Sequence, residues 1–310
     1  MRISERCVSV IIPSRDGSDT IERALDSLRS SSALIREVYL VFSNSPEGYM
    51  QRCQELPARY AQHFALRLLD SGEHSNGSVA RNAPLDVVTS RYVAYLDDDD
   101  EWFDGKLATY MDAIQDLALD GSDFVLFSTV VGCQEDRSQP YLVPSRSYLG
   151  EPVADFILSF GGGAQTSSLL LPTTLAQQVR FDPLLPRHQD YDFCIRLDEH
   201  GAVFHHIDRP LSYWYQRGSN AAKGGSFEFC TRWVLSQRHR LSETAFLGYV
   251  GKEIFAAARA SGDWASFHRF LREHLGRRQR WRVLWGLGLR ALRIKSHGGS
   301  TPAGAAPRAA

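Results

Sequence analysis

Five consecutive carboxylates, residues 97–101, directly follow the apolar segment 92–96. That segment has the length and the aromatic and β-branched composition of a buried strand, so the strand carries negative charge to one edge of a sheet. Adjacent carboxylates repel one another and are tolerable only when they are solvated or neutralised by a cation. Mg²⁺ and Mn²⁺ combine one or two protein carboxylates with water and substrate phosphates. The run therefore predicts a metal–diphosphate site; a solvated acidic turn that caps a helix starting near Asp104 is the alternative.

Composition places the chain among ordinary soluble globular proteins of one large or two small domains, with 310 residues, 43% hydrophobic and 23% charged. The formal net charge of −1 predicts no overall attraction to nucleic acid. Five scattered cysteines without a C-x-x-C pair indicate free thiols. The first residues lack the apolar region of a signal peptide, and no apolar run reaches transmembrane length. We therefore expect a cytoplasmic protein.

Strand and helix patterns alternate through the first two thirds of the chain. In the first half, Asp19 and Glu22 have the spacing of a capping box at the start of a helix. The alternation predicts an α/β fold, a doubly wound and mostly parallel sheet with flanking helices. Ligands bind such sheets at the carboxyl ends of the strands, so the loops that follow successive strands should share one crevice. The expected strands span residues 8–12, 38–42, 64–69, 92–96, 124–131 and 203–207.

Three later segments each allow a functional and a structural interpretation. The three glycines 161–163 indicate a mobile turn or a close approach of backbone to a ligand, or else a plain surface loop. Residues 188–197 turn from polar to amphipathic, which puts Asp190 and Asp192 near a helix start, where they could also serve as caps. The aromatic and polar loop 213–220 suits a polar ligand with apolar faces, or it closes the core.

The C-terminal third changes character. Residues 223–275 are helical in pattern, and residues 276–295 interleave Arg and Lys with Trp and Leu, with no acid after Glu273. Such a basic helix can lie on an anionic membrane; packing on the rest of the chain or on a partner is the alternative. Residues 296–310 consist largely of Gly, Ala, Pro and Ser, and we expect them to be disordered. Residues 1–222 form the remaining predicted domain.

Four segments, in this order, resemble the motif set of the family 2 glycosyltransferases with the GT-A fold, over about residues 7–220. They are residues 8–13, Ala80-Arg81-Asn82, residues 95–102 and Gln189-Asp190-Tyr191-Asp192. The resemblance implies a metal-dependent inverting transferase that uses Mn²⁺ or Mg²⁺. Its donor would be a nucleotide-diphospho-sugar, usually a UDP-sugar. Its acceptor would be a hydroxyl of a glycan, a lipid-linked molecule or a small molecule.

The resemblance also implies roles for individual residues. Asp97, Asp98 and Asp99 match the D-x-D motif, in which the last aspartate holds the metal on the diphosphate and an earlier one meets the ribose. Asp190 matches the general base that removes the proton of the acceptor hydroxyl. Inversion is a single displacement, so one base and one Lewis acid suffice without a protein nucleophile. The other donor-binding matches are Pro13, Arg15, Asn44 and Arg81.

One position departs from the family pattern. The second strand of the family usually ends in a pair of acids followed by Gly-Ser, whereas this chain has Ser43-Asn44-Ser45. Asn44 offers a hydrogen-bond donor and an acceptor to a base edge but no charge. Uridine, thymidine, guanosine and cytidine donors therefore remain open.

Acceptor specificity is expected in the two loops around residues 161–168 and 213–220, because loops carry specificity on such scaffolds. The residues predicted to contact the acceptor are Gly163, Thr166, Tyr215 and Arg217. Two other functions remain open from the sequence: a nucleotide-sugar-binding module without transferase activity, and a membrane- or partner-docking protein with a relict domain.

Overall fold

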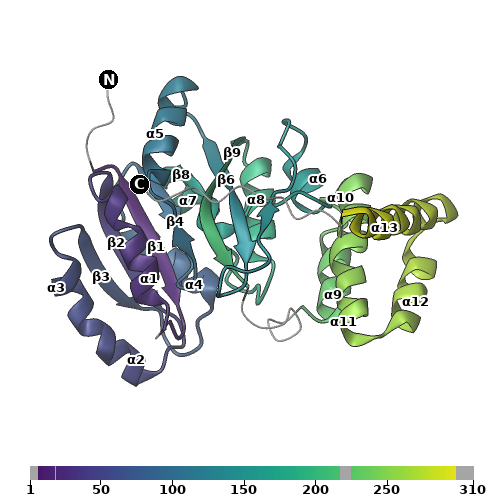
Figure 1. Ribbon diagram of the computed structural model, residues 1–310, viewed down its shortest axis with the longest axis horizontal. Helices are drawn as coiled ribbons and strands as arrows, with labels where there is room; N and C mark the ends of the chain where they lie inside the picture. The colour runs from purple at the N-terminus through teal and green to yellow at the C-terminus, as the bar shows by residue number, and fades with distance from the viewer. Residues whose placement is uncertain (1–5, 18, 217–224, 298–310) are drawn as a thin grey trace. The chain divides into compact units, whose positions relative to one another are not determined.

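The computed structural model describes residues 6–17, 19–216 and 225–297, with side chains to residue 289. The chain divides into two compact units, Met1–Gly224 and Gly225–Ala310. Within the described residues, the first unit is built on one sheet of nine strands, and the second is helical (Figure 1).

Four strands pair in parallel in the order β3-β2-β1-β4. Strands β1 and β4 are buried along their whole length, as expected of apolar runs covered on both faces of a sheet. The register places Ser14 beside Phe42 and Ile11 beside Tyr95, so the loops after β1, β2 and β4 leave the sheet at one edge. The strands are Val8–Ser14 (β1), Ile35–Phe42 (β2), Ala65–Asp70 (β3) and Tyr92–Tyr95 (β4).

Beyond β4 the sheet becomes mixed. Strand β8 lies antiparallel between β4 and β6, β6 pairs in parallel with β9, and β5 and β7 add antiparallel partners to β9 and β6. The expected α/β fold, with a central sheet and flanking helices, is confirmed (Figure 1). The strands are Glu101–Trp102 (β5), Phe124–Cys133 (β6), Tyr141–Val143 (β7), Leu170–Pro172 (β8) and Val203–Tyr215 (β9).

Two expected helix starts differ in the structure. The capping box of Asp19 and Glu22 was wrong, because helix α1 begins after Thr20 and no side chain caps it. Helix α5 begins after Gly105, at a φ of 76°, again without a side-chain cap, so the acidic run does not cap this helix. The helices of the first unit are Ile21–Ser27 (α1), Glu47–Arg52 (α2), Leu56–Tyr60 (α3), Gly77–Asn82 (α4), Lys106–Asp116 (α5), Val153–Ile157 (α6), Thr173–Val179 (α7) and Gln189–Glu199 (α8), with short 3₁₀ turns at Arg29–Ser31, Cys53–Glu55, Ala83–Asp86 and Thr166–Ser168.

Aromatic packing fixes α8 against the end of β4. The rings of Phe181 and Phe193 stack with centroids 3.9 Å apart, and Tyr95 meets both rings edge-on at 5.3 and 6.1 Å. All three side chains are buried. Aromatic pairs of this geometry add about 1 kcal/mol each beyond their buried area. The first turn of α8 is therefore held close to the strand that carries the acidic run.

The triple glycine serves close packing within the chain. A Cβ at Gly162 would lie 1.8 Å from the carbonyl oxygen of Phe156, so only glycine fits beside the backbone of α6. The sequence predicted a mobile turn or a close approach to a ligand, whereas the close approach at Gly162 is to the protein's own main chain.

The described part of the second unit consists of helices, and side chains cap the starts of three of them, α9, α10 and α12. Ser226, Ser242 and Asp263 each accept a hydrogen bond from a backbone N–H three residues further on. No helix within the described ranges has the length and apolarity needed to cross a bilayer. The five cysteines all lie in described segments and are free thiols, as expected. The helices are Phe227–Ser236 (α9), Glu243–Tyr249 (α10), Phe255–Ser261 (α11), Trp264–His274 (α12) and Arg277–His297 (α13), with a π-helical turn at Val250–Ile254 (η5).

Candidate active site

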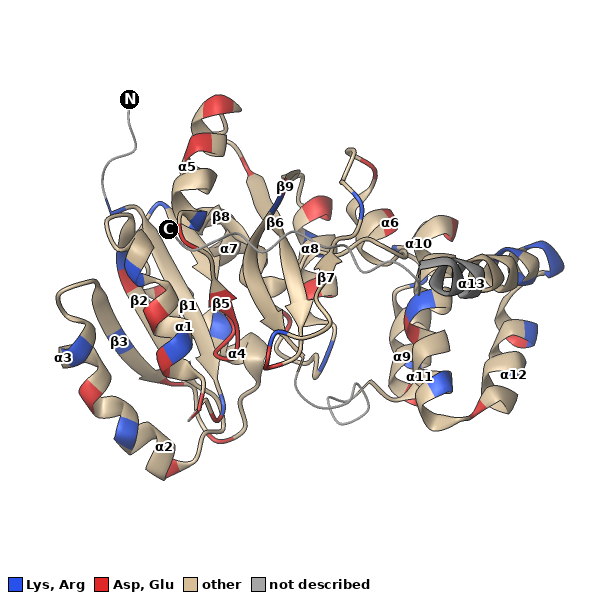
Figure 2. Cartoon of the chain, in the orientation of Figure 1, with Lys and Arg blue, Asp and Glu red and all other residues tan. Residues whose placement is uncertain are grey.

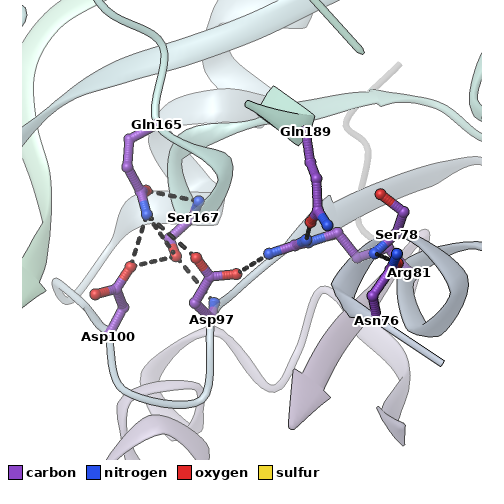
Figure 3. A network of polar contacts seen from close by, with 8 residues as sticks. All are labelled: Asn76, Ser78, Arg81, Asp97, Asp100, Gln165, Ser167 and Gln189. Carbon is purple, nitrogen blue, oxygen red and sulfur yellow. Dashed lines mark hydrogen bonds and ion pairs between the residues drawn. The ribbon is translucent and has the colours of Figure 1, made fainter. Parts of the chain in front are cut away.

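Asp97, the first acid after β4, is held from three directions. Its Oδ1 accepts a hydrogen bond from Nη2 of the buried Arg81 at 2.5 Å, and its Oδ2 accepts a longer one from Gln165 Nε2 at 3.4 Å (Figure 3). Its backbone N–H donates to Ser167 Oγ at 2.9 Å. An arginine–carboxylate pair with little exposure to water has a fixed geometry, so Asp97 is oriented before any ligand binds.

The same arginine reaches α8. Arg81 Nη1 donates to Gln189 Oε1 at 2.9 Å (Figure 3), and Gln189 Nε2 donates to the carbonyl of Leu185 at 2.9 Å. Gln189 is the first residue of α8 and precedes Asp190 directly. One guanidinium therefore connects the acidic run after β4 to the helix start that carries the predicted base.

Asp190 lies in the first turn of α8 and is partly exposed. One carboxylate oxygen, Oδ1, accepts the backbone N–H of Tyr191 at 2.9 Å. Negative charge is favourable at a helix N-terminus, which supports the ionised form that a base requires. Asp192, in contrast, is buried and accepts from Arg196 Nε at 2.7 Å, so the two aspartates of this segment have different surroundings.

Asp98 turns towards β1. Its Oδ2 accepts a hydrogen bond from Ser14 Oγ, and Ser14 Oγ also lies 2.8 Å from the hydroxyl of Tyr49. Gly17 completes this cluster, because a Cβ added there would lie 2.8 Å from Asp98 Oδ2 and 2.9 Å from Tyr49 Oη. The loops after β1 and β4 thus meet at the sheet edge, as their shared register requires.

Asp99 lies between these fixed neighbours and is half-buried. Its backbone carbonyl accepts a hydrogen bond from Arg23 Nη2 at 2.8 Å. Arg23 also forms an ion pair with Glu135, and its Cζ lies 4.0 Å from the centroid of the Tyr215 ring. The main chain at Asp99 is therefore clamped from helix α1.

Asp100 points into the protein and is completely buried. It accepts hydrogen bonds from Ser167 Oγ at 2.5 Å and Gln165 Nε2 at 2.9 Å (Figure 3), and from the backbone N–H of Tyr215 at 3.1 Å. Burial raises the pKa of Asp100 well above its ordinary value, and the charges of Asp99 and Asp97 raise it further. Asp100 thus organises the site from behind and does not face a ligand.

A buried lysine lies behind the same loop. Lys106 Nζ donates to the carbonyl of Ser167 at 2.8 Å and to Ser212 Oγ at 3.3 Å, and it lies over the rings of Trp102 and Tyr110. Burial lowers the pKa of Lys106 well below its ordinary value, and the carboxyl group of Asp100 opposes that shift. The lysine therefore supports the segment that orients Asp97 and Asp100.

Glu101 closes the acidic run by pairing with Arg137 at 2.8 Å and with the hydroxyl of Tyr215 at 2.9 Å. The Arg137 Nε donates to the same hydroxyl at 2.9 Å. Tyr215 was predicted to contact the acceptor. The structure buries its ring and engages both its hydroxyl and its backbone N–H in support of the acidic loop.

The other predicted residues divide by exposure. Pro13 is buried in β1, and Arg15 is exposed just beyond it. Asn44 is exposed after β2 at a φ of 51°, a backbone conformation that asparagine tolerates better than most residues. Two of the residues predicted to contact the acceptor, Gly163 and Thr166, are buried beside the polar network. A third, Arg217, lies outside the described residues.

Sequence reasoning missed several residues of this arrangement, among them Arg23, Lys106, Gln165 and Ser167. Two of them flank Thr166, so the polar segment after the three glycines was a usable signal. Arg23 follows Glu22 at a predicted helix start, and Lys106 lies near the helix start expected at Asp104, so both resemble ordinary solvated positions in the sequence. Their inward orientation comes from tertiary packing alone.

The acidic run could bind a metal ion only together with ligands from a substrate. Within the described part of the chain, no group of three or more His, Cys, Asp or Glu side chains is arranged to hold a metal ion. Mg²⁺ and Mn²⁺ in phosphate-transfer sites use one or two carboxylates and take further ligands from substrate phosphates. Since Arg81 and Ser14 already engage Asp97 and Asp98, the donor set suits a metal that arrives with a diphosphate.

Comparison with known proteins gives the family. The sequence pattern described as Glycosyl transferase family 2 matches residues 9–157. The amylovoran biosynthesis glycosyltransferase AmsB of Erwinia amylovora is 32% identical over 240 residues, which cover 76% of this chain and 78% of AmsB. The chain belongs to glycosyl transferase family 2. This family 2 protein also shares 34% identity over 103 residues with TuaG of Bacillus subtilis, which is named for teichuronic acid biosynthesis; the match covers 32% of this chain and 38% of TuaG.

Solved structures share the fold of this family 2 glycosyltransferase. TarS residues 1–349 from S. aureus, crystallised with UDP-GlcNAc, superimposes with a TM-score of 0.60 at 16% identity, over 90% of this chain and 80% of that one. The mannosyltransferase PcManGT from Pyrobaculum calidifontis, in complex with GDP-Man and Mn²⁺, gives a TM-score of 0.58 at 15% identity, over 97% and 89%. The chain is a glycosyltransferase of the GT-A type.

Gly17 supplies a test of the Asp98 cluster. In Gly17→Ala the new methyl group displaces the Asp98 carboxylate and the Tyr49 hydroxyl, and we expect affinity for a nucleoside diphosphate to fall about tenfold by isothermal titration calorimetry. Gly48→Ala is the control, because its Cβ would have no neighbour closer than Arg52 Nη1 at 3.9 Å. Equal affinity in the two variants would contradict a donor-side role for this cluster.

Asp100→Ala tests the support behind the acidic loop. Removing the carboxylate leaves the backbone N–H of Tyr215 without its buried acceptor, so we expect the free energy of unfolding to fall by about 2 kcal/mol in urea denaturation. The exposed Asp104 provides the control, since Asp104→Ala removes the same side chain from a solvated position and should stay within about 0.5 kcal/mol of the wild type. An effect at Asp100 no larger than that of the control would show that the hydrogen bonds do not stabilise the loop.

Proposed function

We propose that this glycosyltransferase is metal-dependent and inverting, and that it moves a sugar from a nucleotide-diphospho-sugar to an acceptor hydroxyl. The observation that carries the proposal is the Arg81 guanidinium, which contacts both Asp97 of the acidic run and Gln189 beside Asp190. Donor-side acids and the proposed base thus flank one buried arginine. An inverting displacement needs groups on two sides of the anomeric carbon, and the link through Arg81 supports this assignment.

On the donor side, Asp97 and Asp98 would meet the nucleoside and its ribose, and Arg81 would remain beside the diphosphate. The exposed Arg15 and Asn44 border the same sheet edge and are proposed to contact the nucleotide, with Pro13 shaping the loop beneath. TarS was solved with UDP-GlcNAc and PcManGT with GDP-Man, which supports a nucleotide-diphospho-sugar donor. We propose a UDP-sugar, with Asn44 as the residue that reads the base.

Asp99 is the residue proposed to hold Mn²⁺ or Mg²⁺. Arg23 clamps its main chain, so its carboxylate would be presented from a fixed loop. When bound, the metal neutralises the negative charge that develops on the departing diphosphate. The presence of Mn²⁺ in the PcManGT complex supports this assignment.

Asp190 is proposed to accept the proton of the acceptor hydroxyl as the new glycosidic bond forms. The acceptor oxygen bonds to the anomeric carbon while the bond from that carbon to the phosphate oxygen breaks, so no covalent protein intermediate is required. The first turn of α8 favours the ionised carboxylate, and the Tyr191 N–H orients it. Gln189 fixes the neighbouring position through Arg81.

The acceptor is proposed to be a glycan, a lipid-linked molecule or a small molecule, and the buried Gly163, Thr166 and Tyr215 are proposed to shape its binding loops from behind. The names of AmsB and TuaG refer to the biosynthesis of amylovoran and teichuronic acid, which supports a role in glycan assembly. We propose that residues 1–222 form the transferase domain, with a helical region over 223–275, a basic segment over 276–295 and a tail over 296–310. We place the enzyme in the cytoplasm, in peripheral contact with the membrane through the basic segment.

Substitutions at Asp190 and Asp99 distinguish the proposed base from the proposed metal ligand. In Asp190→Asn we expect kcat to fall by about 10²- to 10⁴-fold while donor affinity stays nearly unchanged, because the amide cannot take the proton. In Asp99→Ala we expect the metal-dependent part of UDP binding to disappear in calorimetric titrations with and without Mn²⁺.

Two matched substitutions control for general damage. Asp198→Asn lies at the other end of α8 and Asp104→Ala lies beyond the acidic run, and both should keep wild-type kinetics. Full turnover in Asp190→Asn, or Mn²⁺-enhanced UDP binding in Asp99→Ala, would refute the corresponding assignment.

A further inference from the structure

Helix α13 has two contrasting faces. On its inner face Val283 is buried, and α13 packs against α10 and η5 of the same unit. Gln279 Nε2 donates to Glu243 Oε2 at 3.0 Å, and Arg282 pairs with the same glutamate. These contacts fix the rotation of the helix about its axis.

The outer face carries large apolar side chains. Trp281 is 71% exposed, Trp285 64%, Leu284 43% and Leu289 46%. Positions 281, 284, 285 and 289 follow the i, i+3, i+4, i+8 spacing of one side of an α-helix. Four neighbouring exposed residues of this size form a contiguous apolar surface, and such surfaces mark interaction sites. We call these four residues the outer face of α13.

Positive charge adjoins the outer face. Arg277 and Arg278 begin the helix and are exposed, and by helical spacing they flank the same side as Trp281 and Trp285. The sequence contains no acidic residue after Glu273. Figure 2 shows blue and no red along the described part of α13. The partner of this surface must therefore offer both an apolar region that accommodates large side chains and negative charge.

We propose that the outer face of α13 docks in the plane of an anionic lipid bilayer, with the tryptophans among the headgroups and the arginines against lipid phosphates. A bilayer interface offers both properties at once, and tryptophan is enriched at that depth because its ring is apolar while its N–H is polar. No described helix is able to span a bilayer, so contact through this helix would be peripheral. This inference specifies the peripheral membrane contact that is part of the proposed function, and it rests on that part. It does not depend on the proposed catalytic roles.

Vesicle binding by the full chain tests the inference. Wild-type protein should sediment with vesicles of phosphatidylcholine and phosphatidylglycerol and not with phosphatidylcholine alone. Binding should weaken about tenfold or more in Trp281→Ala/Trp285→Ala and in Arg277→Glu/Arg278→Glu. The charge control is Arg36→Glu/Arg59→Glu, which makes the same change at exposed positions of the first unit and should bind within about twofold of the wild type.

Three results would overturn the proposal. The first is wild-type protein that fails to bind anionic vesicles, and the second is a tryptophan variant that binds them as well as the wild type. The third is a wild-type dimer that becomes monomeric in the tryptophan variant by light scattering, which would make a second copy of the chain the occupant. Turnover with a soluble acceptor, measured on the same samples, tests the transferase proposal separately. Vesicle binding without turnover would refute only the latter.

Discussion

Repulsion among the adjacent carboxylates of residues 97–101 is the constraint on which the site depends. The fold reduces this repulsion by orienting the carboxylates towards different partners. Arg81 engages Asp97, Ser14 engages Asp98, and Arg137 pairs with Glu101. Asp100 is buried among hydrogen-bond donors. Asp99 lies between these residues, and Arg23 donates a hydrogen bond to its main-chain carbonyl.

This dispersal ties distant segments into one site. The partners of the acidic run come from α1, α4, the loop after β6, the turn before β8 and the end of β9. The Arg81 guanidinium extends the network to Gln189 and so to α8, where the stacked Phe181 and Phe193 already fix the helix against β4. Electrostatic compensation and core packing therefore act on the same element. The start of α8, which carries Asp190, owes its position to both.

Much of the fold was predictable because it is encoded locally. The buried strands β1 and β4 are continuous apolar runs, and the acids follow β4 directly, so the carboxyl edge of the sheet could be recognised from the sequence. The antiparallel insertion of β8 between β4 and β6 could not, because long-range pairing leaves little trace in a three-residue strand. The buried state of Lys106 and Tyr215 likewise depends on tertiary contacts. For α13, the pattern was visible in the sequence, but only the anchoring of Gln279 and Arg282 to Glu243 defines which face is outward.

The most direct measurement of the central claim is a double-mutant cycle on kcat/KM with Arg81→Lys, Gln189→Ala and their combination. Lysine keeps the positive charge beside Asp97, but it lacks the planar guanidinium group that lets arginine donate to two partners at once. If one guanidinium joins the acids to α8, Gln189→Ala should impair wild-type enzyme and have little further effect on Arg81→Lys, with a coupling energy of at least about 1 kcal/mol. Additive effects of the two substitutions would contradict the account.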